Sequence, residues 1–426
     1  MKVIFRDALV YENGRIEKHS MLFDGSSFSY FTGDFSPLAN TKIIDNTAIF
    51  PGFCDVHVHF REPGFSYKET VKGGAMAAAA GGYTALMTMP NLNPPPDCKE
   101  NLDIQIDIIR RDSPVPIFPY ATITKGQAGE ELSDMDTLAK SVLAFSDDGR
   151  GVQRGEIMEL AMQKAASLGK IIAAHCEDNS LLRGGYIHDG IYARTHGHKG
   201  ISSESEYAQV ARDIELVKKT GCKYHVCHVS TKESVALIRR AKAEGVDISA
   251  ETAPHYLTLD ESALEEDGRF KMNPPLRERA DREALIEGLT DGTIDMIATD
   301  HAPHSKEEKS RGLAGSAMGI VGLETAFPIL YTRLVKTGIL SLERLVQAMS
   351  IAPRERFKID TDAGYCVFDL AKEYKINPES FKGLGRATPF ENESVYAKNI
   401  LTVYDKKIIY DDMKNGGCKN AKENRH

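Results

Sequence analysis

Eight short runs of apolar, β-rich residues recur through the middle of this 426-residue chain, and helix-like segments separate most of them. The runs are Ala48–Phe60, Tyr83–Met89, Val115–Thr124, Val142–Phe145, Lys170–Ala174, Lys223–Val229, Asp247–Thr252 and Asp295–Thr299. The segments with helical spacing or composition include Lys68–Ala80, Glu156–Ser167, Glu204–Thr220 and Lys232–Glu244. Strands and helices that alternate eight times predict an α/β fold, a parallel (β/α)8 barrel of the TIM type.

The two ends of the chain carry a different pattern, which is typical of β structure. Near the start, Lys2–Val10 and Ile16–Phe23 flank an Asn-Gly pair, which is a strong hairpin signal. Near the other end, Tyr365–Phe368 and Ile400–Tyr410 also have strand composition. We therefore predict that the N- and C-terminal segments pair into one small β-sandwich.

These patterns divide the chain into two parts. Residues 1–47 and 356–426 are predicted to form the β-sandwich, and residues 48–355 the barrel. One charged run inside the barrel part, Ser305–Arg311, is predicted to be a solvated loop.

The charge and the cysteine usage exclude several classes of protein. The net charge is −8 and no long Lys/Arg block occurs, which argues against binding to nucleic acid or to an anionic membrane. The first residues lack the apolar core of a signal peptide, and no apolar stretch reaches the length of a membrane span. Seven scattered cysteines without a CxxC pair favour reduced thiols. We expect a cytoplasmic protein.

Five of the eight predicted strands end in an imidazole or a carboxylate. The first ends in a His-Val-His sequence, and strand alternation turns His57 and His59 to the same side. The other polar strand ends carry Asp147 and Asp148, then His175, then His228, and finally Asp300 and His301. Because the active site of a barrel lies where its strands end, these side chains are expected to meet at one mouth.

A metal site explains this convergence better than structural histidines do. One histidine at a strand end is usually a hydrogen-bonded core residue, but a cluster without water or metal would leave polar groups unpartnered, at about 1–3 kcal/mol each. Imidazole with carboxylate suits zinc, and six such residues suffice for two bridged metal ions. A metal lowers the pKa of bound water from about 16 to about 7, so the site predicts metal-assisted hydrolysis. Spacing alone leaves either Asp147 or Asp148 as the bridge.

The segments around these residues resemble the dihydroorotases of the amidohydrolase superfamily. The matching motifs occur in the family's order from about residue 47 to residue 330, and they are specific in combination. They are PGF, DVHVHFREPG, GGYTALMTMPNLNPP, FSDDG, AHCEDNSL, HVCHVST, AETAPHYLTL, KMNPPLR and IATDHAPH. The fourth strand ends without a lysine, so the chain resembles the bacterial type that lacks the carboxylated lysine.

The resemblance implies a zinc-dependent cyclic amidohydrolase of pyrimidine biosynthesis. Its reaction is the reversible closure of N-carbamoyl-L-aspartate to L-dihydroorotate. The family pattern implies a binuclear site with one or two Zn²⁺ per chain, in which His57, His59 and Asp300 hold one metal. It assigns the other metal to His175 and His228, with Asp148 as the bridge. Asp300 is also expected to carry the proton between the attacking water and the departing nitrogen.

The family pattern also implies a set of substrate contacts. Arg61, Asn91 and His304 are expected to bind the substrate carboxylate, and an arginine fork suits that group. The remaining contacts are His59, Asn273 and the backbone of Met318 and Gly319. An aromatic residue is usual at the position of Met318, so this chain departs from the pattern there.

Two other functions stay open on the sequence. A hydantoinase, dihydropyrimidinase or allantoinase would share the fold, but those relatives favour the modified lysine and lack the full carboxylate clamp. A catalytically silent homologue would serve as a structural partner in a larger pyrimidine complex, but such a homologue should have lost ligands. The expected partner is a small-molecule substrate, and a homodimer is compatible with a metabolic enzyme of this size.

Several polar residues near the motifs are not expected to bind metal. His188, His196 and His198 lie in a Gly-rich loop, and His255 is expected beside the site. Cys176 and Cys227 are predicted by alternation to face away from the neighbouring histidines, as packed thiols.

Overall fold

A computed structural model describes residues 2–33 and 41–413 of the chain, which folds as an α/β protein. Eight short parallel strands lie at the centre of its larger part, and each falls within one of the eight predicted runs. They are β6 (Phe53–Val58), β7 (Tyr83–Thr88), β8 (Ile117–Pro119), β9 (Ala144–Phe145), β10 (Ile171–Ala174), β13 (Lys223–Val226), β14 (Ile248–Thr252) and β15 (Met296–Ile297).

The eight strands follow one another around a ring. One sheet has the order β6-β7-β8 and the other β9-β10-β13-β14-β15. Isolated parallel bridges join the sheets at both edges, between Ala121 and Phe145 and between Val58 and His301. Every residue of β6, β7, β10 and β14 is buried, as expected for parallel strands covered on both faces.

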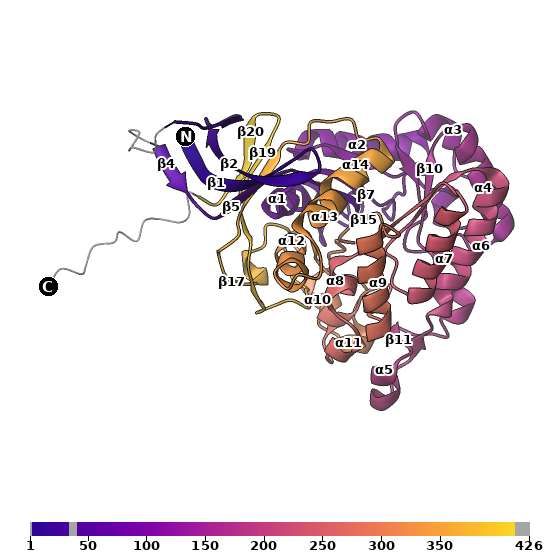
Figure 1. Ribbon diagram of the computed structural model, residues 1–426. Helices are drawn as coiled ribbons and strands as arrows, with labels where there is room; N and C mark the ends of the chain where they lie inside the picture. The colour runs from indigo at the N-terminus through magenta and orange to yellow at the C-terminus, as the bar shows by residue number, and fades with distance from the viewer. Residues whose placement is uncertain (1, 34–40, 414–426) are drawn as a thin grey trace.

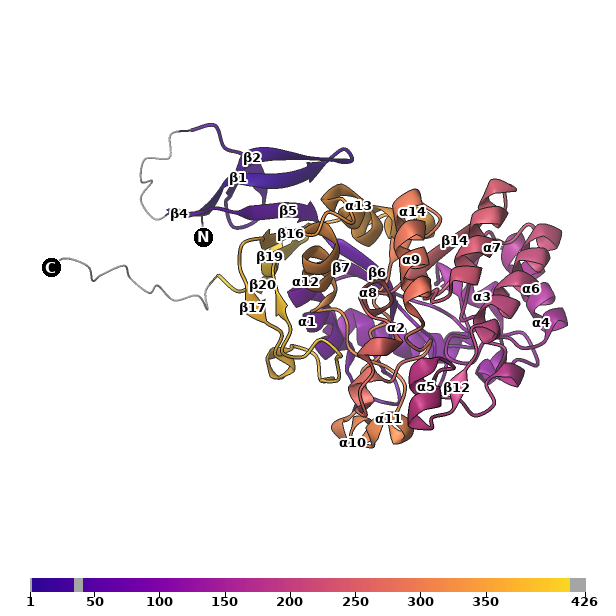
Figure 2. The ribbon, with the colours of Figure 1, turned by 60° about the horizontal axis from the view of Figure 1, so that its bottom comes forward.

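Helices cover the outside of this ring (Figure 2). The long ones are α1 (Val71–Gly81), α2 (Lys99–Asp112), α4 (Gly155–Ser167), α6 (Glu204–Thr220), α7 (Lys232–Ala243) and α9 (Arg279–Asp291). Shorter ones are α3 (Met135–Leu138), α5 (Ile191–His196), α8 (Pro254–Thr258), α10 (Lys306–Lys309), α11 (Gly312–Gly315), α12 (Ala326–Leu330), α13 (Leu342–Val346) and α14 (Ala352–Phe357). Side-chain caps fix several helix starts; Thr70 accepts the Gly73 N–H before α1, and Thr231 accepts the Ser234 N–H before α7. None of the helices in the described part is long and apolar enough to cross a membrane.

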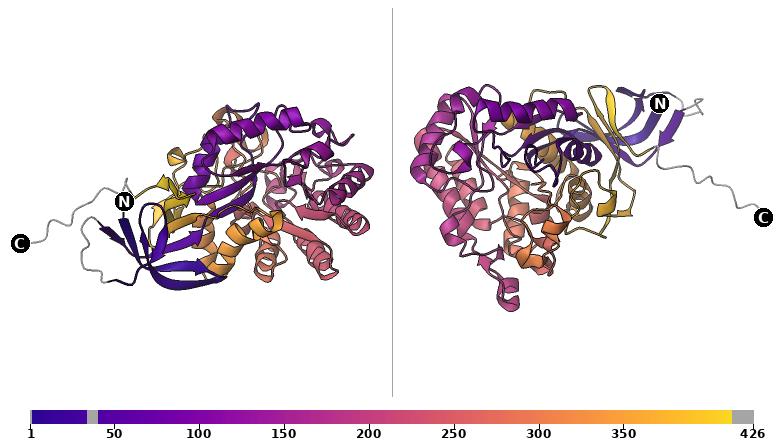
Figure 3. Two further views of the ribbon diagram at one scale, coloured as in Figure 1. Left: turned by 90° about the horizontal axis from the view of Figure 1, so that it is seen from above. Right: turned by 180° about the vertical axis from the view of Figure 1, so that it is seen from behind.

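Both ends of the chain build one further sheet, which lies to one side of the helical part (Figures 1 and 3). Its strands are β1 (Lys2–Glu12), β2 (Arg15–Phe23), β3 (Phe28–Tyr30), β4 (Thr41–Ile44), β5 (Thr47–Pro51), β16 (Tyr365–Asp369), β19 (Lys398–Tyr404) and β20 (Lys407–Asp411). The two ends meet where β5 pairs antiparallel with β16. Asn13 and Gly14 form the predicted hairpin turn between β1 and β2, both with positive φ. The structure describes this part as one hydrogen-bonded sheet, so its division into two layers stays a prediction.

Two predicted strands are each divided in the structure. The run Ala48–Phe60 breaks at Gly52, so that β5 joins the terminal sheet and β6 joins the ring. A Cβ atom at Gly52 would lie 2.2 Å from the Thr84 hydroxyl oxygen, so the close crossing requires glycine. The terminal sheet therefore extends past residue 47 to Pro51. The run Ile400–Tyr410 is a hairpin of β19 and β20, because Asp405 and Lys406 adopt positive φ.

Two loops hold more structure than their composition indicates. The Gly-rich loop contains α5 and the small parallel pair β11 (Ile187–His188) and β12 (Gly200–Ile201), which project from the helical part (Figure 1). A second small pair, β17 (Tyr374–Lys375) and β18 (Ser394–Val395), lies near the C-terminal strands. The prediction of a solvated loop at Ser305–Arg311 is confirmed in part: Lys306, Glu307, Ser310 and Arg311 are exposed, but Ser305 caps the short helix α10 and Lys309 is only 8% exposed.

Candidate metal centre and substrate pocket

Left-handed backbone marks three of the predicted site residues. Arg61, His228 and Asp300 have φ of 60°, 33° and 48°, a region that residues other than glycine rarely adopt. Such strained positions cluster at functional sites. Regular strand alternation ends at these residues, and each of the three side chains lines one cavity at the strand ends.

Asp148, which follows β9, lies between all four predicted histidine ligands. Its Oδ1 atom is 3.3 Å from His57 Nε2 and 3.5 Å from His228 Nε2. The same oxygen is 3.7 Å from His175 Nδ1, and Oδ2 is 3.5 Å from His59 Nε2. A carboxylate in this position can face both halves of a binuclear site at once.

Asp147 has a different environment, although it is the next residue in sequence. Its carboxylate accepts the backbone N–H groups of Ile123 and Thr124 at 2.8 and 3.2 Å, and also the Thr124 hydroxyl. Asp147 therefore ties the end of β9 to the segment after β8 and does not reach the four imidazoles. The geometry separates the two aspartates that spacing left equivalent.

Asp300 completes one side of the cluster. Its Oδ1 atom lies 3.0 Å from His59 Nε2 and 3.6 Å from His57 Nε2. On the other side, His175 Nδ1 and His228 Nε2 are 2.9 Å apart. The predicted ligands form two groups in which three ligand atoms lie within 4.8 Å of one another, one made by His57, His59 and Asp300 and the other by His57, Asp148 and His228.

The donor atoms of this cluster fit a metal cation. His57 Nε2, Asp148 Oδ1 and His175 Nε2 are buried and have no hydrogen-bond partner among the described residues. Burial acts to lower the pKa of His57, but Asp148 and Glu251 outweigh it and raise that pKa well above its usual value. The carboxylates of Asp148 and Glu251 thus favour a positive charge at the centre of the histidine cluster. A zinc ion suits this position, because imidazole and carboxylate are among its usual ligands.

Glu251, on β14, was not singled out by the sequence analysis, yet it orients His57. Its Oε1 atom accepts from His57 Nδ1 at 2.6 Å and from the His228 N–H at 3.2 Å. Its other oxygen is 3.1 Å from His225 Nε2. Because the carboxylate can only accept, His57 carries its proton on Nδ1 and leaves Nε2 free to face Asp148. The sequence held one signal for this role: Glu251 places a carboxylate inside a predicted buried strand, where a charged group needs a hydrogen-bonding partner.

Cys227 is a packed thiol, as predicted: it is buried in an apolar cluster and does not line the cavity at the strand ends. Its sulfur also forms one group within 4.8 Å with His57 and Glu251, a contact that the sequence analysis did not foresee. Cys176 is packed as predicted, with Sγ 3.3 Å from the Tyr224 hydroxyl.

Glu251→Gln is expected to weaken metal binding by about 10- to 100-fold, because an amide can present either oxygen or nitrogen to His57 and no longer fixes its tautomer. Metal affinity would be measured by competition with a chromophoric chelator. Asp55→Asn is the matched control, since Asp55 is a fully buried carboxylate that, within residues 2–33 and 41–413, accepts only from the His57 backbone and from Thr299. Equal metal affinity in Glu251→Gln and the unmodified protein would contradict the assigned role.

A cavity of about 190 Å³ opens above the cluster and brings the predicted site residues together. Fully buried His57 is the one predicted site residue that does not line it. The lining residues are His59, Arg61, Asn91, Asp148, Gly149, His175, His228, Asn273, Asp300, Ala302, His304, Met318 and Gly319. The expected metal ligands and the expected substrate contacts therefore share one cavity.

Hydrogen bonds hold the polar side chains of the cavity wall in place. Arg61 Nε donates to the Pro303 carbonyl at 3.2 Å, and His304 Nε2 donates to the Met318 carbonyl at 2.8 Å. Asn91 Oδ1 is 2.8 Å from His59 Nδ1. Asn273 donates to Glu177 at 3.0 Å, while its own amide oxygen is buried without a partner among the described residues. These contacts leave a preorganised polar wall.

The other histidines lie outside this cavity. His188 lies 3.3 Å from an Arg277 nitrogen, and burial with that arginine lowers the pKa of His188 to about 3. The rings of His196 and His198 lie near Tyr192 on α5. His255 is buried against Tyr256, with ring centroids 4.1 Å apart. None of these side chains lines the cavity.

Comparison with known proteins connects this site to one family. A family model described as Dihydro-orotase-like matches residues 46–234. A dihydroorotase from Fusobacterium nucleatum is 48% identical over 420 residues, which cover 96% of this chain and 99% of that protein. Dihydroorotases from Listeria welshimeri and Anoxybacillus flavithermus are 45% and 46% identical, each over 96% of this chain and 99% of theirs.

Solved structures with the same fold carry other activities. An L-hydantoinase (dihydropyrimidinase) from Arthrobacter aurescens superposes with a TM-score of 0.82 at 24% identity, over 96% of both chains. A D-hydantoinase (dihydropyrimidinase) from a Thermus species gives 0.77 at 22% identity, over 96% of this chain and 95% of that chain. At these identities the likeness concerns the fold and does not extend to the substrate.

Proposed function

The chain belongs to the dihydroorotase family, and we propose that it closes N-carbamoyl-L-aspartate to L-dihydroorotate, and reopens that ring, in the cavity above Asp148. One observation carries the proposal. The cavity is lined both by imidazoles with carboxylates and by the Arg61, Asn91 and His304 group that suits a substrate carboxylate. A cyclic amide that also bears a carboxylate fits both halves of such a site.

We propose that the ring of eight strands is the (β/α)8 barrel of the amidohydrolase superfamily. The edge bridges and the outer helices support this assignment. The two predicted terminal segments, residues 1–47 and 356–426, would form the sandwich module beside the barrel, with the first boundary moved from residue 47 to Pro51 because β5 belongs to the terminal sheet. Residues 1, 34–40 and 414–426 of these segments lie outside the described residues. The chain would cross between them at Gly52, since β5 pairs with β1 and β16.

The metal in this proposal is Zn²⁺, with one or two ions per chain. His57, His59 and Asp300 would hold one, His175 and His228 the other, and Asp148 would lie between them. When bound there, zinc supplies Lewis acidity toward the reacting carbonyl and lowers the pKa of water. The buried, unpartnered donor atoms of His57, Asp148 and His175 support this ligand set.

Asp300 is the group that moves the proton. Burial acts to raise its pKa, but the hydrogen bond to His59 and the nearby histidines outweigh it and hold the pKa below its usual value. Asp300 therefore begins ionised and can take a proton from the attacking water. In hydrolysis it delivers that proton to the ring nitrogen as the C–N bond breaks, and so returns to its ionised form.

Arg61 and His304 bind the carboxylate that does not react. Burial lowers the pKa of Arg61 to about 10, so its guanidinium stays charged at neutral pH. Burial, with Arg61 and Lys68 nearby, lowers the pKa of His304 to about 3. Neutral His304 donates its Nε2 proton in a hydrogen bond to the Met318 carbonyl. Arg61 is therefore the charged partner of the substrate carboxylate.

We further propose a cytosolic enzyme that acts on a small molecule and binds neither nucleic acid nor membrane. The net charge of −8 supports this, as do the six free thiols of the described cysteines. Cys418 lies outside the described residues. A homodimer stays a prediction, which light scattering of the purified protein would test.

Arg61→Met is expected to lower kcat/KM for L-dihydroorotate by about 30- to 1,000-fold, mainly through KM, because a charge-assisted contact to an unreacting group acts in ground and transition states alike. The assay is the ultraviolet absorbance of dihydroorotate during hydrolysis, before and after removal of metal with a chelator. Dihydrouracil, which lacks the carboxylate, is the matched substrate and should be affected far less.

The same assay separates the competing functions. A hydantoinase-type enzyme would prefer dihydrouracil and tolerate the loss of Arg61. A catalytically silent homologue would show no hydrolysis with its metal restored. Either outcome would exclude dihydroorotate as the substrate.

A further inference from the structure

Lys309 is a buried lysine, and among the described residues its ammonium is hydrogen-bonded only to backbone carbonyls. Its Nζ atom donates to the carbonyls of Lys271, Ala317 and Gly319 at 3.0, 2.8 and 2.7 Å. An ammonium has three N–H donors, so all of them are used. Burial, with Lys271 nearby, lowers the pKa of Lys309 to about 7. In its protonated form the side chain makes charge-assisted hydrogen bonds to the three carbonyls, which are stronger than neutral ones.

The three carbonyls belong to two separate segments of the cavity wall. Ala317 and Gly319 flank Met318 on both sides, and Lys271 lies two residues before Asn273. The Gly319 N–H also donates to the Lys271 carbonyl at 3.0 Å. One ammonium therefore joins the Met318–Gly319 segment to the segment that carries Asn273.

This wall cannot satisfy its own carbonyls by regular strand pairing. Gly319 has φ of 137°, and a Cβ there would lie 2.6 Å from the Ala302 carbonyl oxygen. The backbone is thus pressed against the segment after β15, and its parallel bridge to His301 begins only at Ile320. Lys309 provides the donors that a neighbouring strand would otherwise supply.

We propose that Lys309 is a positioning residue for the substrate ring. Its ammonium fixes the Met318–Gly319 backbone at the distance from Asn273 and His304 that the ring requires. The proposal rests on the proposed function, since it assigns a role within the same cavity. Lys309 touches no reacting atom, so its loss should loosen substrate binding and spare the chemical step.

The central test compares Lys309→Met with Lys170→Met. Lys170 is a half-buried lysine whose ammonium also donates to a backbone carbonyl, that of Val142 at 2.8 Å, and it does not line the substrate cavity. Lys309→Met should raise KM for dihydroorotate at least ~10-fold while kcat stays within ~3-fold, and Lys170→Met should change KM less than ~3-fold. A fall in kcat at unchanged KM, or equal effects of the two variants, would overturn the proposal.

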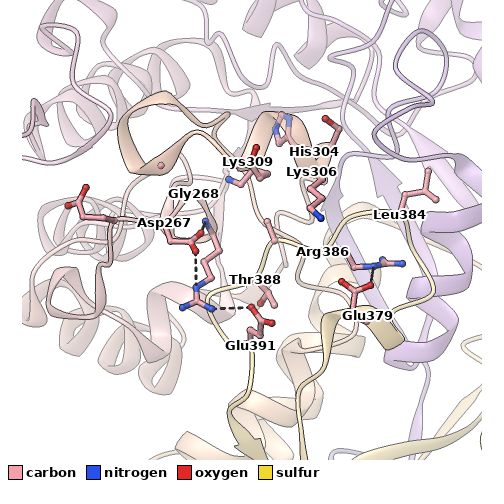
Figure 4. A pocket seen from close by; sticks show the side chains of 16 residues that line it. Asp267, Gly268, His304, Lys306, Lys309, Glu379, Leu384, Arg386, Thr388 and Glu391 are labelled. Carbon is pink, nitrogen blue, oxygen red and sulfur yellow. Dashed lines mark hydrogen bonds and ion pairs between the residues drawn. The ribbon is translucent and has the colours of Figure 1, made fainter.

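Chemical rescue provides a second readout. Lys309 also lines an open cavity of about 470 Å³ between α10 and the C-terminal segment, where it lies close to His304 (Figure 4). Lys309→Ala should therefore admit ethylammonium, which restores the three N–H donors and should recover at least ~half of the lost kcat/KM. Tetramethylammonium has the same charge but no donor, and it should not rescue. Equal rescue by both cations, or by neither, would contradict the proposal.

Hydrogen exchange tests the same idea without any assay of activity. In the substrate-free protein, the peptide that contains Gly319 should exchange faster in Lys309→Met than in Lys170→Met. Lys309→Gln, which keeps an amide donor, is the second variant if Lys309→Met does not fold. Unchanged exchange would show that Lys309 does not hold the Met318–Gly319 backbone in place.

The failure of the proposed function would look different. If the unmodified protein did not hydrolyse dihydroorotate, the proposed function would be refuted, and the exchange result alone would decide the role of Lys309.

Discussion

Asp148→Ala is expected to lower kcat by at least ~1,000-fold, because a bound metal contributes several kcal/mol to stabilisation of the transition state and Asp148 faces all four imidazoles. Zinc content should fall together with activity. Elemental analysis of the unmodified protein should give about one to two zinc per chain, and of the variant well below one.

Asp147→Ala is the matched control, one residue away. Asp147 accepts hydrogen bonds from Ile123 and Thr124, so its loss should lower the free energy of unfolding by about 1–3 kcal/mol and leave the zinc content near that of the unmodified protein. The opposite ranking in zinc content would show that Asp147 is the bridge. Activity should also be independent of bicarbonate, because the strand end offers no lysine to carboxylate.

The parts of the fold that repeat could be predicted from the sequence. Parallel strands that are covered on both faces are apolar along most of their length. The eight strands of the ring therefore appear in the sequence as eight short apolar runs. The ends of such strands meet at one edge, which allowed His57 and Asp300 to be placed together across most of the chain. The 3.6 Å distance between His57 Nε2 and Asp300 Oδ1 agrees with that placement.

The features that sequence reasoning missed depend on contacts between distant residues. Gly52 divides a continuous apolar run only because Thr84 packs against it. In the sequence, Glu251 is one polar residue within a predicted strand, and only the fold shows that it lies 2.6 Å from His57. Lys309 sits in a run of charged residues, and only the folded chain brings its three carbonyl partners around it. Neither composition nor periodicity carries such information.

The likeness of fold to hydantoinases and the sequence similarity to dihydroorotases both extend over nearly the whole chain, but only the second is close enough to show the family. In the proposed function, the wall where Arg61 and His304 meet the backbone of Met318 would decide the substrate. That wall is also where Lys309 acts in the proposed scheme, so substrate choice and substrate affinity would be set by the same few loops.

Asp300→Ala is expected to lower kcat for dihydroorotate by at least ~100-fold with little change in KM, because proton transfer contributes only as the amide bond breaks or forms. An amide nitrogen leaves poorly unless it is protonated, and Asp300 lines the cavity with its carboxylate 3.0 Å from His59. Kinetics would be measured in both directions, since microscopic reversibility requires the same loss in ring closure.

The variant could lose activity merely by losing metal, so a second substitution is needed. Asp300→Asn keeps an oxygen that can face the metal with His57 and His59 but cannot take up a proton at neutral pH. With zinc content equal to that of the unmodified protein, Asp300→Asn should still lose at least ~100-fold in kcat. If it retained near-normal kcat with full zinc, Asp300 would be a ligand alone. Another group of the cavity would then have to carry the proton. The first candidate to test would be His304, which is neutral and lies 3.3 Å from Arg61.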